Sequence, residues 1–362
     1  MPEAQGVGEL AVMAQRDLPV QLYPGYRPGV EECWMEMDGG RMRYLRTESN
    51  APSLADAGNG EPGSSFPTNS FSSDSFPTNS SISPEKTPLI LLHGLLGYSF
   101  SWRHAMPSLA PYTTVYALDM MGAGFSDRVS GLDHSMRGTA RRVLQFAERL
   151  GITSFDLLGT SHGGAVAMMA AAECLQPQSR MQVRQLILVA PVNPYSAHGR
   201  RLAPFVGSPL GTMLFRHTVA HVRPVFAYAH ARMYGDRSRI LPGTLEGYLA
   251  PLAKPRLFEH ALSIVRTWTE DLRELEATLP KLASVPTLFM WGSKDTAVFP
   301  SSAEPLAKFF PHSNLIIFPG VGHLPYEETP QEFNAALIDF LTDNNFPACN
   351  SRMNRDSVLN CD

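Results

Sequence analysis

The sequence predicts an α/β fold with a mostly parallel, doubly wound sheet of eight strands and a helical cap inserted between the sixth and seventh strands. From residue 89 onwards, apolar runs alternate with helical segments, which is typical of a parallel sheet covered by helices on both faces. Two runs with alternating apolar residues come earlier and indicate an antiparallel pair. Residues 195 to 280 interrupt the alternation with helical sequence rich in aromatic residues, methionine and histidine, and we interpret this stretch as the cap.

The first predicted element is a β-hairpin at residues 31 to 47. Apolar side chains alternate on both sides of Asp38-Gly39-Gly40, and an Asp-Gly turn is a strong hairpin signal. Residues 48 to 86 break the pattern, because they are rich in Ser, Pro, Gly and Asn and repeat Ser-Phe-Pro-Thr-Asn-Ser at positions 65 and 75. This composition buries too little apolar surface to offset its ordering entropy, so we expect a flexible low-complexity insertion between the second and third strands.

The remaining elements follow from apolar runs and helical periodicity. Strands are expected at 89–93, 114–119, 154–159, 185–190, 286–291 and 314–318, and helices near 136–150, 163–176 and 330–343. The predicted organisation is an N-terminal extension (1–30), an α/β core (31–194 and 281–345), a helical cap (195–280) and a disordered tail (346–362).

The strongest chemical signal is Gly159-Thr160-Ser161-His162-Gly163, which lies between an apolar run and an alanine-rich segment. A serine between two such glycines predicts a nucleophile elbow, a turn so tight that any Cβ at the glycines would collide with the neighbouring strand or helix. The turn lifts the hydroxyl clear of the sheet, at a helix N-terminus that favours developing negative charge. Ser161 is therefore the candidate nucleophile.

A serine hydroxyl is a poor nucleophile at neutral pH, so it needs a base and an acid that orients the base. On such an elbow these partners are expected later in the chain, in the order Ser, acid, His. Asp295 ends the polar turn after the apolar run at 286–291, and His323 follows the run at 314–318. His323 is the preferred base, because His162 should point away along its helix and His93 belongs to an earlier loop.

The tetrahedral intermediate of this chemistry also needs preorganised hydrogen-bond donors. The backbone N–H of His162, directly after the nucleophile, is expected to be one donor of this oxyanion hole. The other should come from the loop after the strand at 89–93, where Gly94 permits a turn that aims the N–H of Leu95 inward.

The chain resembles enzymes of the α/β-hydrolase fold. The resemblance extends from about Met35 to Leu341 and excludes the one insertion. The resemblance rests on His93-Gly94, the turn from Asp119 to Ser126, the elbow, Trp291-Gly292-Ser293-Lys294-Asp295 and Gly322-His323. It implies that the turn from Asp119 is structural, shaping a loop beside the oxyanion hole, and takes no part in catalysis. Met121 departs from the proline or arginine that many relatives have there, which affects no catalytic assignment.

The resemblance also implies an acyl pocket between the carboxyl ends of the strands and the cap. Phe100 and Trp102, on the oxyanion loop, and Phe226 and Tyr228, in the cap, are candidates for its walls. Arginine and lysine outnumber acids between residues 195 and 256. This local excess indicates either the steering of an anionic substrate or a solvated face.

The predicted function is a serine esterase that cleaves carboxylic esters through an acyl-enzyme, with no cofactor and no metal. Epoxide hydrolases and haloalkane dehalogenases resemble the chain in its loops but use an aspartate at the elbow, so Ser161 argues against both. Proline iminopeptidases have tryptophan after the nucleophile and acidic cap residues, unlike this chain. Two alternatives stay open: a carbon–carbon bond hydrolase of ring-cleavage-type diketo acids, which the arginine-rich cap favours, and a non-catalytic ligand-binding relative.

The composition limits the classes of partner and the cellular compartment that we expect for this protein. With 44% hydrophobic residues, 18% charged residues and a net charge of −4, nothing points to a nucleic-acid partner. Cys33, Cys174, Cys349 and Cys361 lack metal or redox spacing, so we expect reduced thiols. The N-terminus lacks the pattern of a signal peptide, and no apolar run has the length of a membrane span. We therefore expect a cytoplasmic enzyme without a membrane partner, acting on a small-molecule ester or related acyl substrate.

Overall fold

The computed structural model describes residues 29–37, 39–47, 87–196, 208, 210, 213, 222–253 and 256–343. The predicted low-complexity insertion, the tail and most of the N-terminal extension lie outside these residues, as do Cys349 and Cys361. Cys33 and Cys174, which are described, are free thiols.

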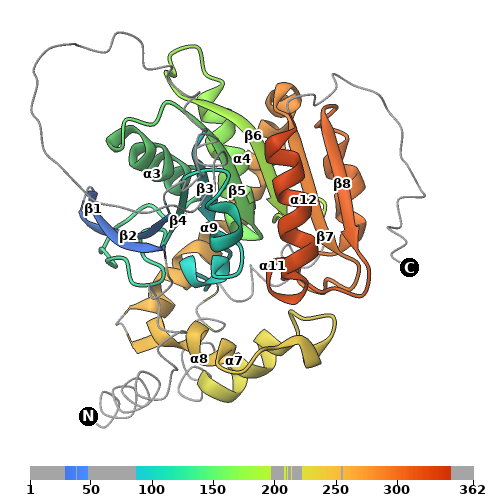
Figure 1. Cartoon of the computed structure of the whole chain (residues 1–362). Coiled ribbons are helices and arrows are strands. Elements are labelled where there is room, and N and C mark those ends of the chain that lie inside the picture. Colours follow the sequence, from blue (N-terminus) through green and yellow to red (C-terminus); the bar gives the residue numbers. More distant parts are fainter. Residues whose placement is uncertain are drawn as a thin grey trace, which may run out of the picture.

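The described residues contain one sheet of eight strands, in the order β1-β2-β4-β3-β5-β6-β7-β8 (Figure 1). Strands β3 to β8 are parallel to one another, whereas β2 pairs antiparallel with both β1 and β4. The mostly parallel sheet and the N-terminal hairpin are thus confirmed. The strands are β1 (Glu31–Met37), β2 (Gly40–Thr47), β3 (Leu89–Leu92), β4 (Val115–Leu118), β5 (Ser154–Thr160), β6 (Gln182–Val189), β7 (Thr287–Gly292) and β8 (Ser313–Phe318).

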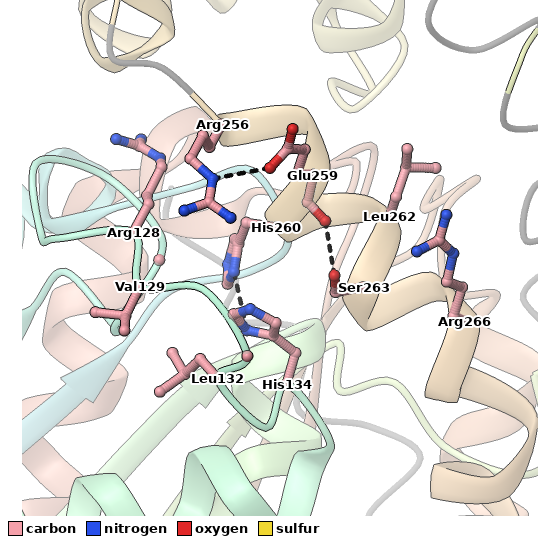
Figure 2. A pocket seen from close by; sticks show the side chains of 12 residues that line it. Arg128, Val129, Leu132, His134, Arg256, Glu259, His260, Leu262, Ser263 and Arg266 are labelled. Atoms are coloured by element: carbon pink, nitrogen blue, oxygen red, sulfur yellow. Dashed lines mark hydrogen bonds and ion pairs between the residues drawn. The ribbon is translucent and has the colours of Figure 1, made fainter. Parts of the chain in front are cut away.

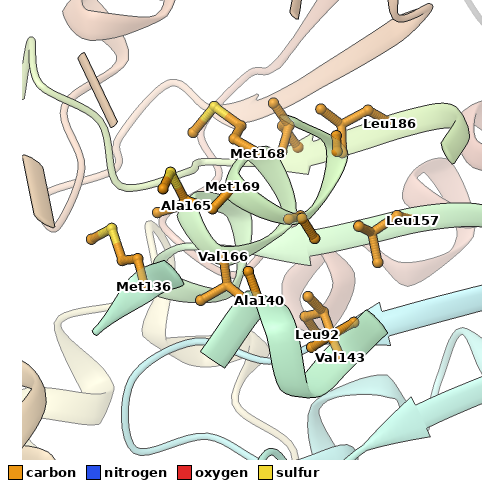
Figure 3. Close-up of a cluster of buried hydrophobic side chains, with 14 of the residues drawn as sticks. Leu92, Met136, Ala140, Val143, Leu157, Ala165, Val166, Met168, Met169 and Leu186 are labelled. Atoms are coloured by element: carbon orange, nitrogen blue, oxygen red, sulfur yellow. The ribbon is translucent and has the colours of Figure 1, made fainter. Parts of the chain in front are cut away.

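Helices cover both faces of the sheet. Side chains alternate between the faces, so Leu92 and Leu157 pack under α3 and α4 (Figure 3), and their neighbours Leu91 and Leu158 face α2 and α12. Alanine-rich α4 is buried along almost its whole length, because its small side chains allow close contact with the strands. The helices outside the cap are η2 (Ser99–Trp102), α2 (Met106–Leu109), α3 (Met136–Arg149), α4 (His162–Cys174), η6 (Pro300–Ser302), α10 (Ala303–Ala307), α11 (Pro325–Glu328) and α12 (Pro330–Thr342).

A helical segment separates β6 from β7, as the sequence predicts. Its described helices are α7 (Val222–Ala231), η3 (Arg237–Arg239), α8 (Thr244–Leu249), η4 (Ala250–Ala253), α9 (Leu257–Thr278) and η5 (Leu279–Ser284). Figure 1 shows α7 and α8 grouped apart from the sheet. The later part of α9 instead packs against α3 and α4, where Ile264, Trp268 and Leu272 join the main hydrophobic core. None of the described helices is both long and apolar enough to cross a bilayer.

The parallel arrangement decides where the candidate residues meet. His93 follows β3, Ser161 follows β5, and Asp295 and His323 lie in the turns after β7 and β8. Since parallel strands end at the same edge of a sheet, all four residues gather at the carboxyl edge.

Candidate active site

Ser161 lies in the turn between β5 and α4. Its backbone has φ 52° and ψ −121°. Such a conformation costs a non-glycine residue roughly 1–3 kcal/mol and persists only where its surroundings impose it. The Ser161 N–H donates to the carbonyl of Val189 (2.9 Å), and the Ser161 carbonyl accepts from the N–H groups of Gly164 (3.0 Å) and Val192 (2.9 Å). The strained turn is therefore held between β6 and the first turn of α4.

Backbone contacts explain the two glycines of the elbow. A Cβ on Gly159 would lie 2.2 Å from the carbonyl oxygen of Gly163, and a Cβ on Gly163 would lie 2.3 Å from that of His93. These are the collisions expected from the sequence, and no side-chain movement could relieve them because both partners are backbone atoms.

His323 and Asp295 form a buried pair. Nδ1 of His323 lies 2.7 Å from Oδ2 of Asp295, and the two side chains are 6% and 0% exposed. Oδ1 of Asp295 accepts the backbone N–H groups of Ala297 (2.8 Å) and Val298 (3.0 Å). Because a carboxylate only accepts hydrogen bonds, it selects the histidine tautomer with its proton on Nδ1 and leaves Nε2 able to accept a proton.

The loop that holds His323 is fixed by the cap. The His323 N–H donates to the carbonyl of Met233 (2.6 Å). A Cβ on the preceding Gly322 would lie 2.2 Å from the same carbonyl oxygen, so only glycine fits there. The position of the candidate base therefore depends on the backbone just after α7.

Ser161 and His323 line one cavity of about 580 Å³. No hydrogen bond joins these two side chains in the described part of the chain, and in ligand-free enzymes such catalytic contacts are often long. Most other residues lining the cavity are apolar or aromatic, including Val192, Phe226, Tyr228, Met233, Trp268, Val298, Leu324 and Tyr326. The cavity thus brings a candidate nucleophile and a candidate base together in apolar surroundings.

The loop after β3 runs beside the nucleophile. A Cβ on Gly94 would lie 3.1 Å from Cβ of Ser161, and Leu95 lines the cavity with Ser161. Nε2 of His93 accepts the N–H of Met120 (3.1 Å), so its proton is on Nδ1, which donates to the Gly94 carbonyl (2.8 Å). That carbonyl shares a planar peptide unit with the Leu95 N–H, so His93 fixes the direction of the predicted oxyanion donor. Sequence reasoning missed this role of His93.

The sequence profile of the alpha/beta hydrolase fold family matches residues 87–330. The chain belongs to the α/β-hydrolase fold family. It is 26% identical over 266 residues to haloalkane dehalogenase 2 from Mycobacterium tuberculosis, covering 70% of this chain and 87% of the relative. It is 24% identical over 265 residues to a monoacylglycerol lipase from Xenopus laevis, covering 71% and 76%. The fold is similar to that of the Cif epoxide hydrolase from Acinetobacter nosocomialis, with a TM-score of 0.67 and 17% identity over 94% and 97% of the two chains.

The reactions named for these proteins differ from one another. Membership of the α/β-hydrolase family supports a hydrolase but leaves open which bond it cleaves, because this fold carries several chemistries. The reaction must be inferred from the site of this chain.

Two predicted pocket residues lie outside the cavity of this α/β-hydrolase. Phe100 and Trp102 are buried in η2 and are absent from the cavity lining, so the prediction for both is wrong. The Phe100 ring lies 4.1 Å from the guanidinium carbon of Arg103, and the Trp102 ring packs on Tyr326 with centroids 4.8 Å apart. The helical turn of η2 directs both rings into the interior, an orientation that strand-and-helix patterns do not predict.

The two cap candidates, Phe226 and Tyr228, do line the cavity. Arg232 lines it as well, with its guanidinium carbon 6.0 Å from the Tyr228 ring. Another arginine of the basic stretch, Arg223, forms an ion pair with Glu246 (2.9 Å). The basic stretch is thus partly neutralised and places one described arginine at the cavity.

The side chain of His162 is buried near the loop after β3. Its ring stacks on Trp268 of α9 with centroids 5.9 Å apart, and its Nε2 has no hydrogen-bond partner among the described residues. Burial, with smaller effects of His93 and His134, lowers the pKa of His162 to about 3. The imidazole is therefore neutral in the folded protein at neutral pH.

This neutral imidazole is expected to make the protein acid-sensitive. Below pH 6.5, the ordinary pKa of histidine, the unfolded chain binds a proton that folded His162 excludes until about pH 3. The free energy of unfolding should therefore fall as pH falls from 6.5, and His162 alone should account for a loss of about 2 kcal/mol at pH 5. Urea unfolding at pH 7, 6 and 5 measures this loss. His162→Gln should show a shallower pH dependence, and equal slopes in the two proteins would contradict the assignment.

Sequence reasoning also missed a buried ion pair within the core, which hydrogen bonds connect to the cap. Arg103, after η2, and Glu327, on α11, are 4% and 1% exposed and form a bidentate pair. Tyr248 of α8 donates to Glu327 (2.7 Å), and Arg103 donates to Thr244 (3.2 Å). Burial alone would lower the pKa of Arg103 and raise the pKa of Glu327, but the attraction between the pair reverses both shifts.

The adjacent Glu328 connects the cap to the loop of the base. Its fully buried carboxylate accepts the N–H groups of Gly235, Asp236 and Gly322, each at 2.9 Å. Gly322 directly precedes His323, so Glu328 positions the backbone of the candidate base. The available sequence signal was a pair of acids shortly after His323, in a segment too apolar for a solvated turn.

Asp119 is scaffold, as the resemblance implies. Its Oδ1 accepts the N–H of Ser99 (2.8 Å), and its Oδ2 accepts the N–H of Phe125 (2.8 Å) and a guanidinium N–H of Arg43 (3.1 Å). These bonds tie η2 to the turn after β4 and to β2. They anchor η2, which follows the loop after β3, and Asp119 is absent from the cavity lining.

Proposed function

We propose that this protein is a serine hydrolase that cleaves carboxylic esters through an acyl-enzyme. The observation that carries the proposal is the place of Ser161, on a strained elbow and in one apolar cavity with His323, whose ring Asp295 orients. Dehalogenases and epoxide hydrolases of this fold use an aspartate at the elbow. A serine there instead favours attack on an acyl carbon.

The proposed reaction uses each residue at a defined atom. Oγ of Ser161 attacks the ester carbonyl carbon while Nε2 of His323 takes the hydroxyl proton. Asp295 keeps the other proton on Nδ1 and stabilises the imidazolium. The N–H groups of Leu95 and His162 donate to the oxyanion, and His323 then gives its proton to the departing alcohol. Water, deprotonated by His323, attacks the acyl carbon of the acyl-enzyme. The bond from that carbon to Oγ of Ser161 then breaks, His323 returns the proton to Oγ, and the acid departs.

The cavity favours an apolar acyl group. Its volume of about 580 Å³ lies within the usual range for small-molecule sites, and Val192, Phe226 and Val298 contribute to its apolar walls. Each methylene that leaves water for such a wall gains about 0.8 kcal/mol. We therefore expect kcat/KM to rise from acetate towards longer acyl chains until the cavity is filled.

The test is hydrolysis of p-nitrophenyl esters from acetate to decanoate by wild type and Ser161→Ala. We expect wild-type turnover with an optimum beyond acetate, and a loss of about 10⁴-fold or more in the variant, because the remaining groups give only residual catalysis. Thermal unfolding of the variant controls for folding. Turnover that persists in folded Ser161→Ala would exclude the proposed nucleophile.

A carbon–carbon hydrolase is the second candidate, and the observation in its favour is Arg232 at the cavity. A guanidinium suits the carboxylate of a ring-cleavage-type diketo acid. Turnover of such an acid without turnover of any ester would select this candidate. Tight ligand binding with no turnover of either class would favour a non-catalytic relative.

A further inference from the structure

A second cavity, of about 270 Å³, lies between the turn after β4 and the start of α9 (Figure 2). One of its lining residues, His260, also lines a small crevice together with Leu95 and His162. The cavity therefore lies close to the loop after β3. The described residues that line it include three arginines, Arg128, Arg256 and Arg266, and a single acid, Glu259. This excess of positive charge is unlike the apolar cavity of the active site and points to an anion.

Arg128 is the most informative of the three arginines. One of its terminal nitrogens donates to the Gly124 carbonyl (2.8 Å), but its Nε is buried and has no hydrogen-bond partner among the described residues. Burial lowers the pKa of Arg128, and Asp119 opposes that shift only through its charge. Arg128 is half-buried, and a guanidinium that loses part of its contact with water without a contacting carboxylate is destabilised. An oxyanion in the cavity would offset this.

Arg256 and a histidine pair complete the polar wall. Nε of Arg256 donates to Glu259 (2.9 Å) at the partly exposed rim, and Figure 2 shows its guanidinium directed towards His260. Nδ1 of His260 lies 3.0 Å from Nδ1 of His134, so one ring donates to the other. Burial lowers the pKa of His134 to about 4 and that of His260 to about 2, which leaves the cationic charge of the cavity on the arginines.

We propose that this cavity binds a small organic oxyanion, a carboxylate or a phosphate monoester, through Arg128 and Arg256. Guanidinium groups offer paired N–H donors that match the oxygens of either head group. The cavity of about 270 Å³ also has room for a short carbon skeleton, which Val129 and Leu132 would contact. The proposal does not rest on the proposed esterase activity, because the site is separate from Ser161 and is tested by binding.

Isothermal titration calorimetry with phenyl phosphate and with butyrate, at constant ionic strength, tests this site in the full chain. We expect one-to-one binding of at least one probe, and the tighter probe identifies the head group. Arg128→Gln and Arg256→Gln should each weaken binding by about tenfold or more, since each removes charge-assisted hydrogen bonds. Thermal unfolding of both variants controls for folding.

Two arginine variants serve as matched controls. The first is Arg273→Gln, because Arg273 also lies on α9 but pairs with exposed Glu270. The second is Arg232→Gln, because Arg232 lines the cavity of Ser161 instead. Both should bind the probe like wild type. The proposal is overturned if neither probe binds at millimolar concentration, if Arg128→Gln and Arg256→Gln bind like wild type, or if only Arg232→Gln loses binding.

Discussion

Asp295→Asn is expected to fold normally and to lose about 10⁴-fold in kcat for esters. The reason lies in the two oxygens of Asp295. Oδ1 accepts two backbone N–H groups, so an asparagine should keep its carbonyl oxygen there and turn its NH₂ towards Nδ1 of His323. Nδ1 must then accept, the proton moves to Nε2, and His323 can no longer take the proton of Ser161.

The measurement is kcat on the best p-nitrophenyl ester, with thermal unfolding of the same samples. Asp236→Asn is the matched control, since Asp236 accepts from Ser238 on the partly exposed cap surface and lies outside the cavity lining. It should keep wild-type kcat. An Asp295→Asn enzyme within tenfold of wild type would contradict the assigned role of Asp295.

Arg103→Met is expected to lower the free energy of unfolding by about 3–5 kcal/mol. The change leaves the Glu327 carboxylate buried without its countercharge, although Tyr248 still donates to it. Replacing both partners, in Arg103→Met with Glu327→Leu, should recover much of the loss, because no unpaired charge then stays buried. Urea unfolding at pH 7 of wild type, Arg103→Met, Glu327→Leu and the double variant completes the double-mutant cycle.

The exposed pair Arg273–Glu270 provides the control for this cycle. Its side chains are 72% and 79% exposed, so Arg273→Met should change the free energy of unfolding by less than about 1 kcal/mol. An equally small effect at Arg103 would contradict a stabilising role for its buried ion pair with Glu327.

The sequence predicted those parts of the fold and site that depend on local pattern. Apolar runs located all six parallel strands, and the glycines around Ser161 indicated the tight turn that the structure contains. Asp295 and His323 could be predicted because each follows a strand, and parallel topology brings the ends of such strands to one edge. Their 2.7 Å contact is a consequence of that topology.

Features that depend on contacts between distant segments could not be predicted. Arg103 and Glu327 are 224 residues apart in the chain, and each alone resembles a surface charge. The orientation of Phe100 depends on its contacts with the cap, where a Cβ on Gly247 would lie 2.1 Å from the Phe100 ring. The cavity at Arg128 and Arg256 likewise arises only where the turn after β4 meets α9.

The central claim is that Ser161 is an activated acyl nucleophile, and covalent capture tests it most directly. When an alkyl fluorophosphonate reacts with the protein, the oxygen of Ser161 forms a bond to the phosphorus of the reagent. Fluoride departs, and His323 takes the hydroxyl proton. Peptide mass spectrometry should find one adduct on wild type, located at Ser161, and none on Ser161→Ala. A folded wild-type protein that stays unmodified, or that is modified equally in Ser161→Ala, would contradict the account.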